Sequence, residues 1–157
     1  MGVEIERKFL VDHAAWGRLN KPAGVRYKQG YMLNEKDRTV RIRVSDDRAY
    51  LNLKSRSTAV SRKEYEYEIP LKDGLEILEH FTQNHIEKVR YDIPFSGKTW
   101  EVDVFEGDNA GLIVAEIELE SEDEEFEKPT WVAAEVTDDA RYTNASLVKH
   151  PFKTWDK

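Results

Sequence analysis

Hydrophobic and polar residues alternate with a period of two along most of the chain. This period is typical of β-strands with one buried face, because successive side chains of a strand point to opposite sides. In the segment 39–45, for example, valine and isoleucine alternate with Arg41 and Arg43. The alternation predicts strands at Val3–Val11, Tyr27–Leu33, Thr39–Ser45, Ala49–Ser55, Arg62–Ile69, Ile86–Phe95, Thr99–Phe105 and Leu112–Glu120.

The predicted strands mostly follow one another after short turns, which favours antiparallel pairing. Asp46 and Asp47 are typical of a hairpin turn between two of them. Eight antiparallel strands can close into a barrel whose interior holds one small ligand. The pattern therefore predicts a mainly β (α+β) fold. We expect an eight-stranded closed antiparallel β-barrel, or tunnel, with a few flanking helices, as a single domain over residues 1–157.

Two segments have the pattern of helices. An apolar stripe that ends at Phe81 predicts a helix capped by Asp73, with Glu76 three residues later as in a capping box. A second helix is predicted over Thr143–Lys149, ended by Pro151. Both helices are too short to cover the apolar outer face of a whole barrel. Large exposed apolar patches are rare on monomers, so this favours a homodimer.

The composition narrows the class of protein. The aromatic content of 11% is too high for a disordered chain. The absence of cysteine excludes disulfides, thiolate catalysis and Cys-ligated zinc. The first ten residues carry several charges, and no stretch of the sequence is long and apolar enough to span a membrane. We therefore expect a cytoplasmic protein that does not interact with a membrane.

The net charge of −7 argues against a nucleic-acid-binding surface, which is usually basic. An anionic ligand would need a local concentration of positive charge, shielded from the acidic remainder. Taken one strand at a time, the charged faces are typical of solvated outer surfaces. Taken together they are segregated by sign, with carboxylates on the first and last two strands and cations on strands between them.

Such segregation costs stability through like-charge repulsion unless ligands neutralise each group. Metal ions would neutralise the carboxylates, and carboxylate oxygens without Cys or clustered His suit Mg²⁺ or Mn²⁺. Phosphates would neutralise the cations, since Arg binds phosphate oxygens bidentately and Lys adds point charges. Seven cations indicate a polyanion instead of a single phosphate: Lys8, Arg41, Arg43, Lys54, Arg62, Lys88 and Arg90.

The motif Glu4-Ile5-Glu6-Arg7-Lys8 resembles the ExExK signature of the CYTH superfamily, the triphosphate tunnel metalloenzymes. Further matching segments follow in family order: Arg41-Ile42-Arg43, Leu53-Lys54, Arg62 with Glu64 and Glu66, Lys88-Val89-Arg90, Asp103, Glu116-Ile117-Glu118 and Glu135-Val136-Thr137. The resemblance spans almost the full chain and is greatest to the small bacterial inorganic triphosphatases. It implies an eight-stranded antiparallel tunnel, which agrees with the alternation.

The resemblance also implies roles for individual residues. It assigns metal binding to Glu4, Glu6, Asp103, Glu116 and Glu118. It assigns triphosphate binding to Lys8, Arg41, Arg43, Lys54, Arg62, Lys88 and Arg90. Glu64 and Glu66 would support neighbouring cations or order water. Tyr31 would act with Lys8 in catalysis, although Tyr27 lies on the same face and is an alternative.

These roles predict an enzyme that hydrolyses a small-molecule triphosphate with Mg²⁺ or Mn²⁺, with inorganic tripolyphosphate as the favoured substrate. A class IV adenylate cyclase and a thiamine triphosphatase on the same scaffold are the alternatives. A non-catalytic polyphosphate-binding module is a further alternative, but binding alone would need only the cations.

Overall fold

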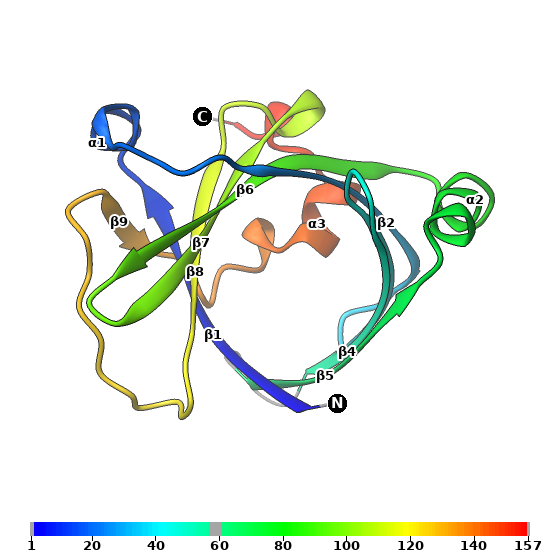
Figure 1. The fold of residues 1–157 in the computed structure, drawn as a ribbon, viewed down its shortest axis with the longest axis horizontal. Helices are drawn as coiled ribbons and strands as arrows, with labels where there is room; N and C mark the ends of the chain where they lie inside the picture. Colours follow the sequence, from blue (N-terminus) through cyan, green and yellow to red (C-terminus); the bar gives the residue numbers. More distant parts are fainter. Residues whose placement is uncertain (1, 57–60, 157) are drawn as a thin grey trace.

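The computed structural model describes residues 2–56 and 61–156, and within these ranges nine antiparallel strands form one sheet. Eight of them close into a ring, because β1 pairs with β8 on one side and with β5 on the other (Figure 1). The strands are β1 (Gly2–Val11), β2 (Val25–Asn34), β3 (Arg38–Val44), β4 (Ala49–Arg56), β5 (Ser61–Ile69), β6 (His85–Phe95), β7 (Lys98–Phe105), β8 (Ile113–Glu118) and β9 (Val132–Glu135).

The predicted mainly β fold with a closed antiparallel ring of eight strands is thus confirmed. All eight strands expected from the alternation are present, with ends that differ by a few residues. The short strand β9 was not expected. It pairs with the end of β1 outside the ring.

Three α-helices lie in the described ranges: α1 (His13–Arg18), α2 (Leu71–Phe81) and α3 (Asn144–Lys149). The expectation that Asp73 caps α2 is wrong, because the helix begins two residues earlier, after Pro70, with no side-chain cap. Asp73 lies in the first turn, where its charge interacts favourably with the helix dipole. None of the helices described has the length and apolarity that a membrane crossing requires.

Much of the apolar packing lies on the outer face of the ring. Helix α2 packs Leu78 against Ile42 and Ala49 of the sheet. On the opposite side, Trp16 of α1 and Trp131 pack with Trp100 of β7 in edge-to-face contacts. These segments cover much of the outer face, and the charged alternate face is left to the interior.

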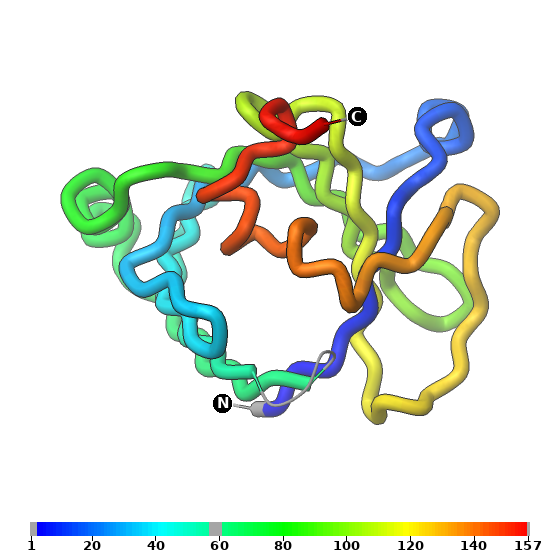
Figure 2. The backbone as a smooth tube through the Cα atoms, turned by 180° about the vertical axis from the view of Figure 1, so that it is seen from behind, coloured from blue at the N-terminus to red at the C-terminus, as the bar shows by residue number. Residues whose placement is uncertain are grey.

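Helix α3 lies across one end of the ring. Seen from behind in Figure 2, residues 140–149 cross the opening. Leu147 is fully buried against Ile86, Phe105 and Val114 at this end. The helix is also tied to the end of β2, where Asn34 Nδ2 donates to the carbonyl of Ala145 over 2.9 Å. The C-terminal helix therefore contributes to the interior, and not to the cover of the outer face.

Candidate active site

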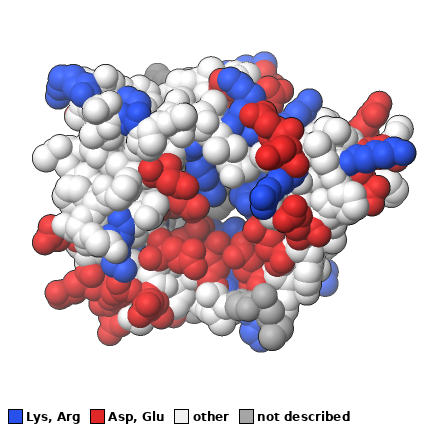
Figure 3. Space-filling model, in the orientation of Figure 1, with Lys and Arg blue, Asp and Glu red and all other residues white. Residues whose placement is uncertain are grey.

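The ring encloses a cavity of about 210 Å³. Figure 3 shows a hollow in the middle of the face opposite α3, with acidic side chains massed below it and basic side chains at its rim. The cavity is lined by Glu4, Glu6, Lys8, Tyr31, Thr39, Arg41, Arg43, Lys54, Arg62, Glu64, Glu66, Arg90, Glu101, Glu116, Glu118, Thr143, Asn144 and Ala145. All predicted site residues are in this lining except Lys88 and Asp103, which are fully buried beside Arg90.

The carboxylates come from two neighbouring strands. In the β1–β8 ladder Glu6 lies opposite Glu118, and Lys8 lies opposite Glu116. Burial raises the pKa of Glu6 to about 8, with further contributions from the charges of Glu116 and Glu4. A hydrogen bond between the two side chains also raises the pKa of Glu6 and lowers that of Glu116.

The pKa of Glu116 shifts in the opposite direction. Burial alone would raise its pKa, but Lys8, the hydrogen bond with Glu6, and Arg90 together lower the pKa well below its usual value. Arg90 Nη2 lies 3.7 Å from Glu116 Oε1. The pKa values of the two neighbouring carboxyls thus shift in opposite directions, as expected of like charges held close together.

The acids form an all-oxygen donor set that suits a hard divalent cation. In the described part of the chain no three acidic or histidine side chains are already gathered as a metal site. Instead the acids contact cations, with Glu4 Oε1 3.1 Å from Lys54 Nζ and Glu6 Oε1 3.2 Å from Arg62 Nη2. The chemistry of the donors fits a metal ion, which would take over the neutralisation that these cations now provide.

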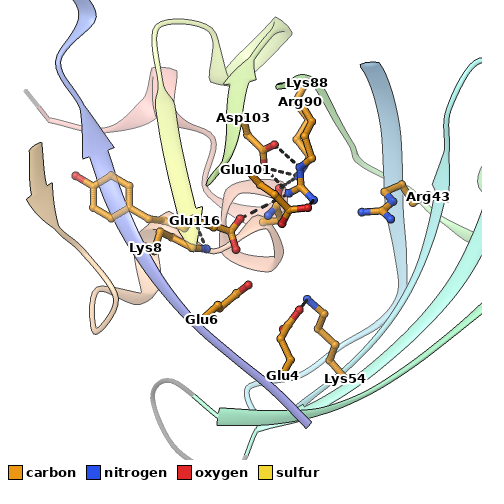
Figure 4. Close-up of polar contacts among 12 residues, drawn as sticks. Glu4, Glu6, Lys8, Arg43, Lys54, Lys88, Arg90, Glu101, Asp103 and Glu116 are labelled. Atoms are coloured by element: carbon orange, nitrogen blue, oxygen red, sulfur yellow. Dashed lines mark hydrogen bonds and ion pairs between the residues drawn. The ribbon is translucent and has the colours of Figure 1, made fainter. Parts of the chain in front are cut away.

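The basic side chains come mainly from the strands across the ring, as Figure 4 shows for Arg43 and Lys54. Burial, together with the charges of Arg41 and Arg90, lowers the pKa of Arg43. The ring of Tyr27 lies 4.8 Å from Arg43 Cζ. Crowded cations of this kind indicate a site that binds an anion.

Asp103 lies between two of the predicted phosphate ligands. It accepts from Lys88 Nζ at 2.7 Å and from Arg90 Nε and Nη2 at 2.7 and 2.9 Å (Figure 4). Burial opposes its ionisation, but Arg90 and Lys88 outweigh burial and lower its pKa to about 2. These contacts fix the direction of Arg90. The role of Asp103 as a metal ligand stays a prediction.

Sequence reasoning missed several polar residues of the tunnel. Asn52 is buried on the inner face of β4 and donates to both Glu64 and Glu66, at 2.9 and 3.0 Å. Glu101 lines the cavity 3.4 Å from Arg90 Nη1. Asn52 and Glu101 share faces with Lys54 and Asp103, so the alternation carried a signal for both. Asn144 of α3 accepts from Lys88 Nζ at 3.3 Å, and only the three-dimensional fold places it there.

The two candidate tyrosines are separated by the structure. Tyr31 lines the cavity, whereas Tyr27 packs on Arg43. The Nζ atom of Lys8 is 3.4 Å from the carbonyl oxygen of Tyr142, just before α3. Of the two tyrosines, Tyr31 is therefore the one in the cavity lining, and its part in catalysis stays a prediction.

The sequence matches the CYTH domain family over residues 2–151. A protein from Acetivibrio thermocellus, named inorganic triphosphatase, is 52% identical over 156 residues, which cover 99% of each chain. A protein of the same name from Nitrosomonas europaea is 38% identical and covers 92% of this chain and 95% of its own.

A solved structure supports the same relation. The crystal structure of an inorganic triphosphatase is similar with a TM-score of 0.65 and 32% identity, covering 94% of this chain and 95% of that one. The chain belongs to the CYTH family. Its closed ring of strands with a charged interior agrees with that membership.

Proposed function

We propose that this protein hydrolyses inorganic tripolyphosphate in the tunnel, with Mg²⁺ or Mn²⁺ as cofactor. The observation that carries the proposal is one enclosed cavity whose wall holds carboxylates on β1 and β8 and Arg and Lys side chains on the facing strands. An elongated polyanion neutralises the cations, and divalent metal neutralises the acids. Membership of the CYTH family and the names of the two relatives support the same activity.

The side chains of the tunnel divide the work of the reaction. The guanidinium groups of Arg41 and Arg43 hold phosphate oxygens bidentately, and Arg90 does so in a direction fixed by Asp103. Lys8 and Tyr31 help to position the water or the leaving phosphate. Acids such as Glu4 and Glu118 would hold the metal ions, which would neutralise charge and lower the pKa of a bound water. Water attacks a terminal phosphorus, and the products are pyrophosphate and orthophosphate.

Two alternatives share this scaffold. A class IV adenylate cyclase must seat a nucleoside, and a thiamine triphosphatase must seat thiamine. Among the described residues that line the cavity, Tyr31 is the one aromatic side chain, and the lining is otherwise charged or polar apart from Ala145. The cavity therefore offers little surface for stacking a base, which favours a substrate without an organic group.

The proposal extends to the assembly and location of the protein. We propose a homodimer formed through the part of the outer face that no helix covers, and a cytoplasmic location. The partner in the reaction is a small-molecule triphosphate, and the acidic net charge disfavours nucleic acid.

Identification of products tests the function directly. The purified protein is incubated with Mg²⁺ or Mn²⁺ and with tripolyphosphate, thiamine triphosphate or ATP in turn. We expect tripolyphosphate to yield pyrophosphate and phosphate, pyrophosphate to be a poor substrate, and ATP to be cleaved slowly or not at all. Conversion of ATP to cyclic AMP, with tripolyphosphate left intact, would overturn the hydrolase proposal.

A further inference from the structure

A second cavity adjoins the tunnel beside α3. It has a volume of about 150 Å³ and lies between the α3 segment, the β2–β3 turn and the facing ends of β4 and β5. It shares with the tunnel the lining residues Thr39, Lys54, Arg62, Thr143 and Ala145. The two cavities therefore adjoin each other at the end of the ring that α3 crosses.

This second cavity is strongly basic. Lys36 lines it from the β2–β3 turn, Arg38 from the start of β3, and Arg56 from the end of β4. Lys54 and Arg62 complete the set, and Asp37 is the one acid among the described lining residues. The tunnel has glutamates interspersed with its cations, so this excess of one sign is confined to the second cavity.

Arg56 lies beside a second arginine in the sheet. Arg56 lies directly opposite Arg62 in the β4–β5 ladder, and like charges in that position destabilise a sheet. It shares the inner face of β4 with Lys54, two residues before it. Arg62 has Glu6 as a partner at 3.2 Å, but among residues 2–56 and 61–156 Arg56 has no ion-pair partner. An anion between the two arginines would remove the repulsion.

We propose that this second cavity is a binding site for a phosphate group that reaches it from the tunnel, held by Arg56 together with Lys36 and Arg62. The inference rests on the proposed function of the tunnel and adds a subsite to it. The phosphate group comes from one of two sources. It is either a further unit of a chain longer than tripolyphosphate, or the orthophosphate product on its way out.

The variant Arg56→Ala tests the site, with Lys63→Ala as the matched control. Lys63 is an exposed cation on the outer face of β5, close in sequence but pointing away from the cavity. We compare kcat/KM for tetraphosphate with kcat/KM for tripolyphosphate, and measure the inhibition constant of orthophosphate. Loss of one charge-assisted hydrogen bond corresponds to a change of about tenfold.

The two sources give different results. If the site holds a further unit of the chain, Arg56→Ala lowers the ratio of the two kcat/KM values about tenfold. If it holds the product, the ratio is unchanged and the inhibition constant of orthophosphate rises by a similar factor. Arg56→Lys should recover part of either effect. The proposal is overturned if neither quantity moves, or if Lys63→Ala moves both as much.

Calorimetry separates this inference from the function of the tunnel. Titration of metal-free protein with orthophosphate and with tetraphosphate requires no turnover, and circular dichroism checks that each variant is folded. If the protein does not hydrolyse tripolyphosphate but Arg56→Ala weakens binding of either anion, the proposed function fails and the site stands. Equal binding by wild type and Arg56→Ala rejects the site, whether or not hydrolysis occurs.

Discussion

The raised pKa of Glu6 in the tunnel wall has a consequence for stability. Burial raises the pKa of Glu6 from 4.5 to about 8. The folded protein therefore binds more protons than the unfolded chain between these values. The stability contributed by protonated Glu6 is complete below pH 4.5 and is lost as the pH rises through about 8.

We therefore expect the free energy of unfolding of the metal-free protein to fall between pH 5 and pH 8, by on the order of a few kcal/mol at most. Glu6→Gln, which cannot ionise, should remove this slope. Glu116 has a lowered pKa, so its own contribution changes only at more acidic pH. Urea denaturation at several pH values gives the free energy of unfolding of the wild type and of Glu6→Gln. The same pH dependence in both proteins would show that Glu6 is not the group responsible.

Glu118 tests the metal role of the acidic wall. Glu118→Gln removes a negative oxygen ligand with little change in volume, while the facing cations remain. We expect turnover of tripolyphosphate in Mg²⁺ to fall roughly 100-fold or more, with substrate binding largely kept. The control is Glu120→Gln, since Glu120 is exposed and outside the tunnel lining. A near-normal rate for Glu118→Gln in Mg²⁺ would rule out Glu118 as an essential ligand.

Asp103 distinguishes positioning from metal binding. The variant Asp103→Asn removes the negative charge and leaves Lys88 and Arg90 buried without it. Such a loss typically lowers the free energy of unfolding by about 3–5 kcal/mol. If Asp103 positions Arg90, we expect lower stability and a higher KM for tripolyphosphate, with an unchanged affinity for Mn²⁺. Denaturation, kinetics and metal titration measure the three quantities. A selective loss of metal affinity, with stability intact, would instead make Asp103 a ligand.

At the scale of elements, Leu147 is the fully buried apolar side chain by which α3 packs inside the ring. It lies among side chains from β6, β7 and β8. Leu147→Ala should lower the free energy of unfolding by about 2–5 kcal/mol. Leu75→Ala on α2 is the control, because Leu75 is 50% exposed and its truncation should cost much less. Equal losses for the two variants would show that α3 is not anchored by Leu147.

The alternation was enough to predict the eight strands, because most of them have one apolar and one polar face. The short elements α1 and β9 span too few residues to display a period. The pattern of Asp73 and Glu76 resembled a cap, but Pro70 sets the helix start, since proline fixes φ and has no N–H to satisfy.

The charged part of the site was predictable for the same reason. Side chains two apart on a strand share a face, so closing the ring brings Glu4 and Lys54 together. The alternation places Asn52 on the inner face with Lys54, but its uncharged side chain does not indicate that it donates to two glutamates. The contribution of Asn144 could not be predicted, because it depends on the tertiary packing of α3 into the ring.

At the scale of the whole molecule, the outer face is covered unevenly. Trp16 and Trp131 lie on one side and α2 on another, but Val40, Leu53 and Tyr65 form a cross-strand row on the outer face that is only partly buried. Tyr67 on the same face of β5 is 54% exposed. A contiguous apolar surface of this kind is typical of an interface between protein chains.

We therefore expect the protein to be a homodimer in solution, with this face of β4 and β5 in the contact. Light scattering over a range of concentrations should give the mass of two chains. Tyr67→Glu places a negative charge in the proposed interface. This should destabilise the dimer and shift the measured mass to that of one chain. Val25→Glu is the control, because Val25 is also exposed but lies on β2. A wild-type protein that stays monomeric at high concentration would show that this face is not a dimer interface.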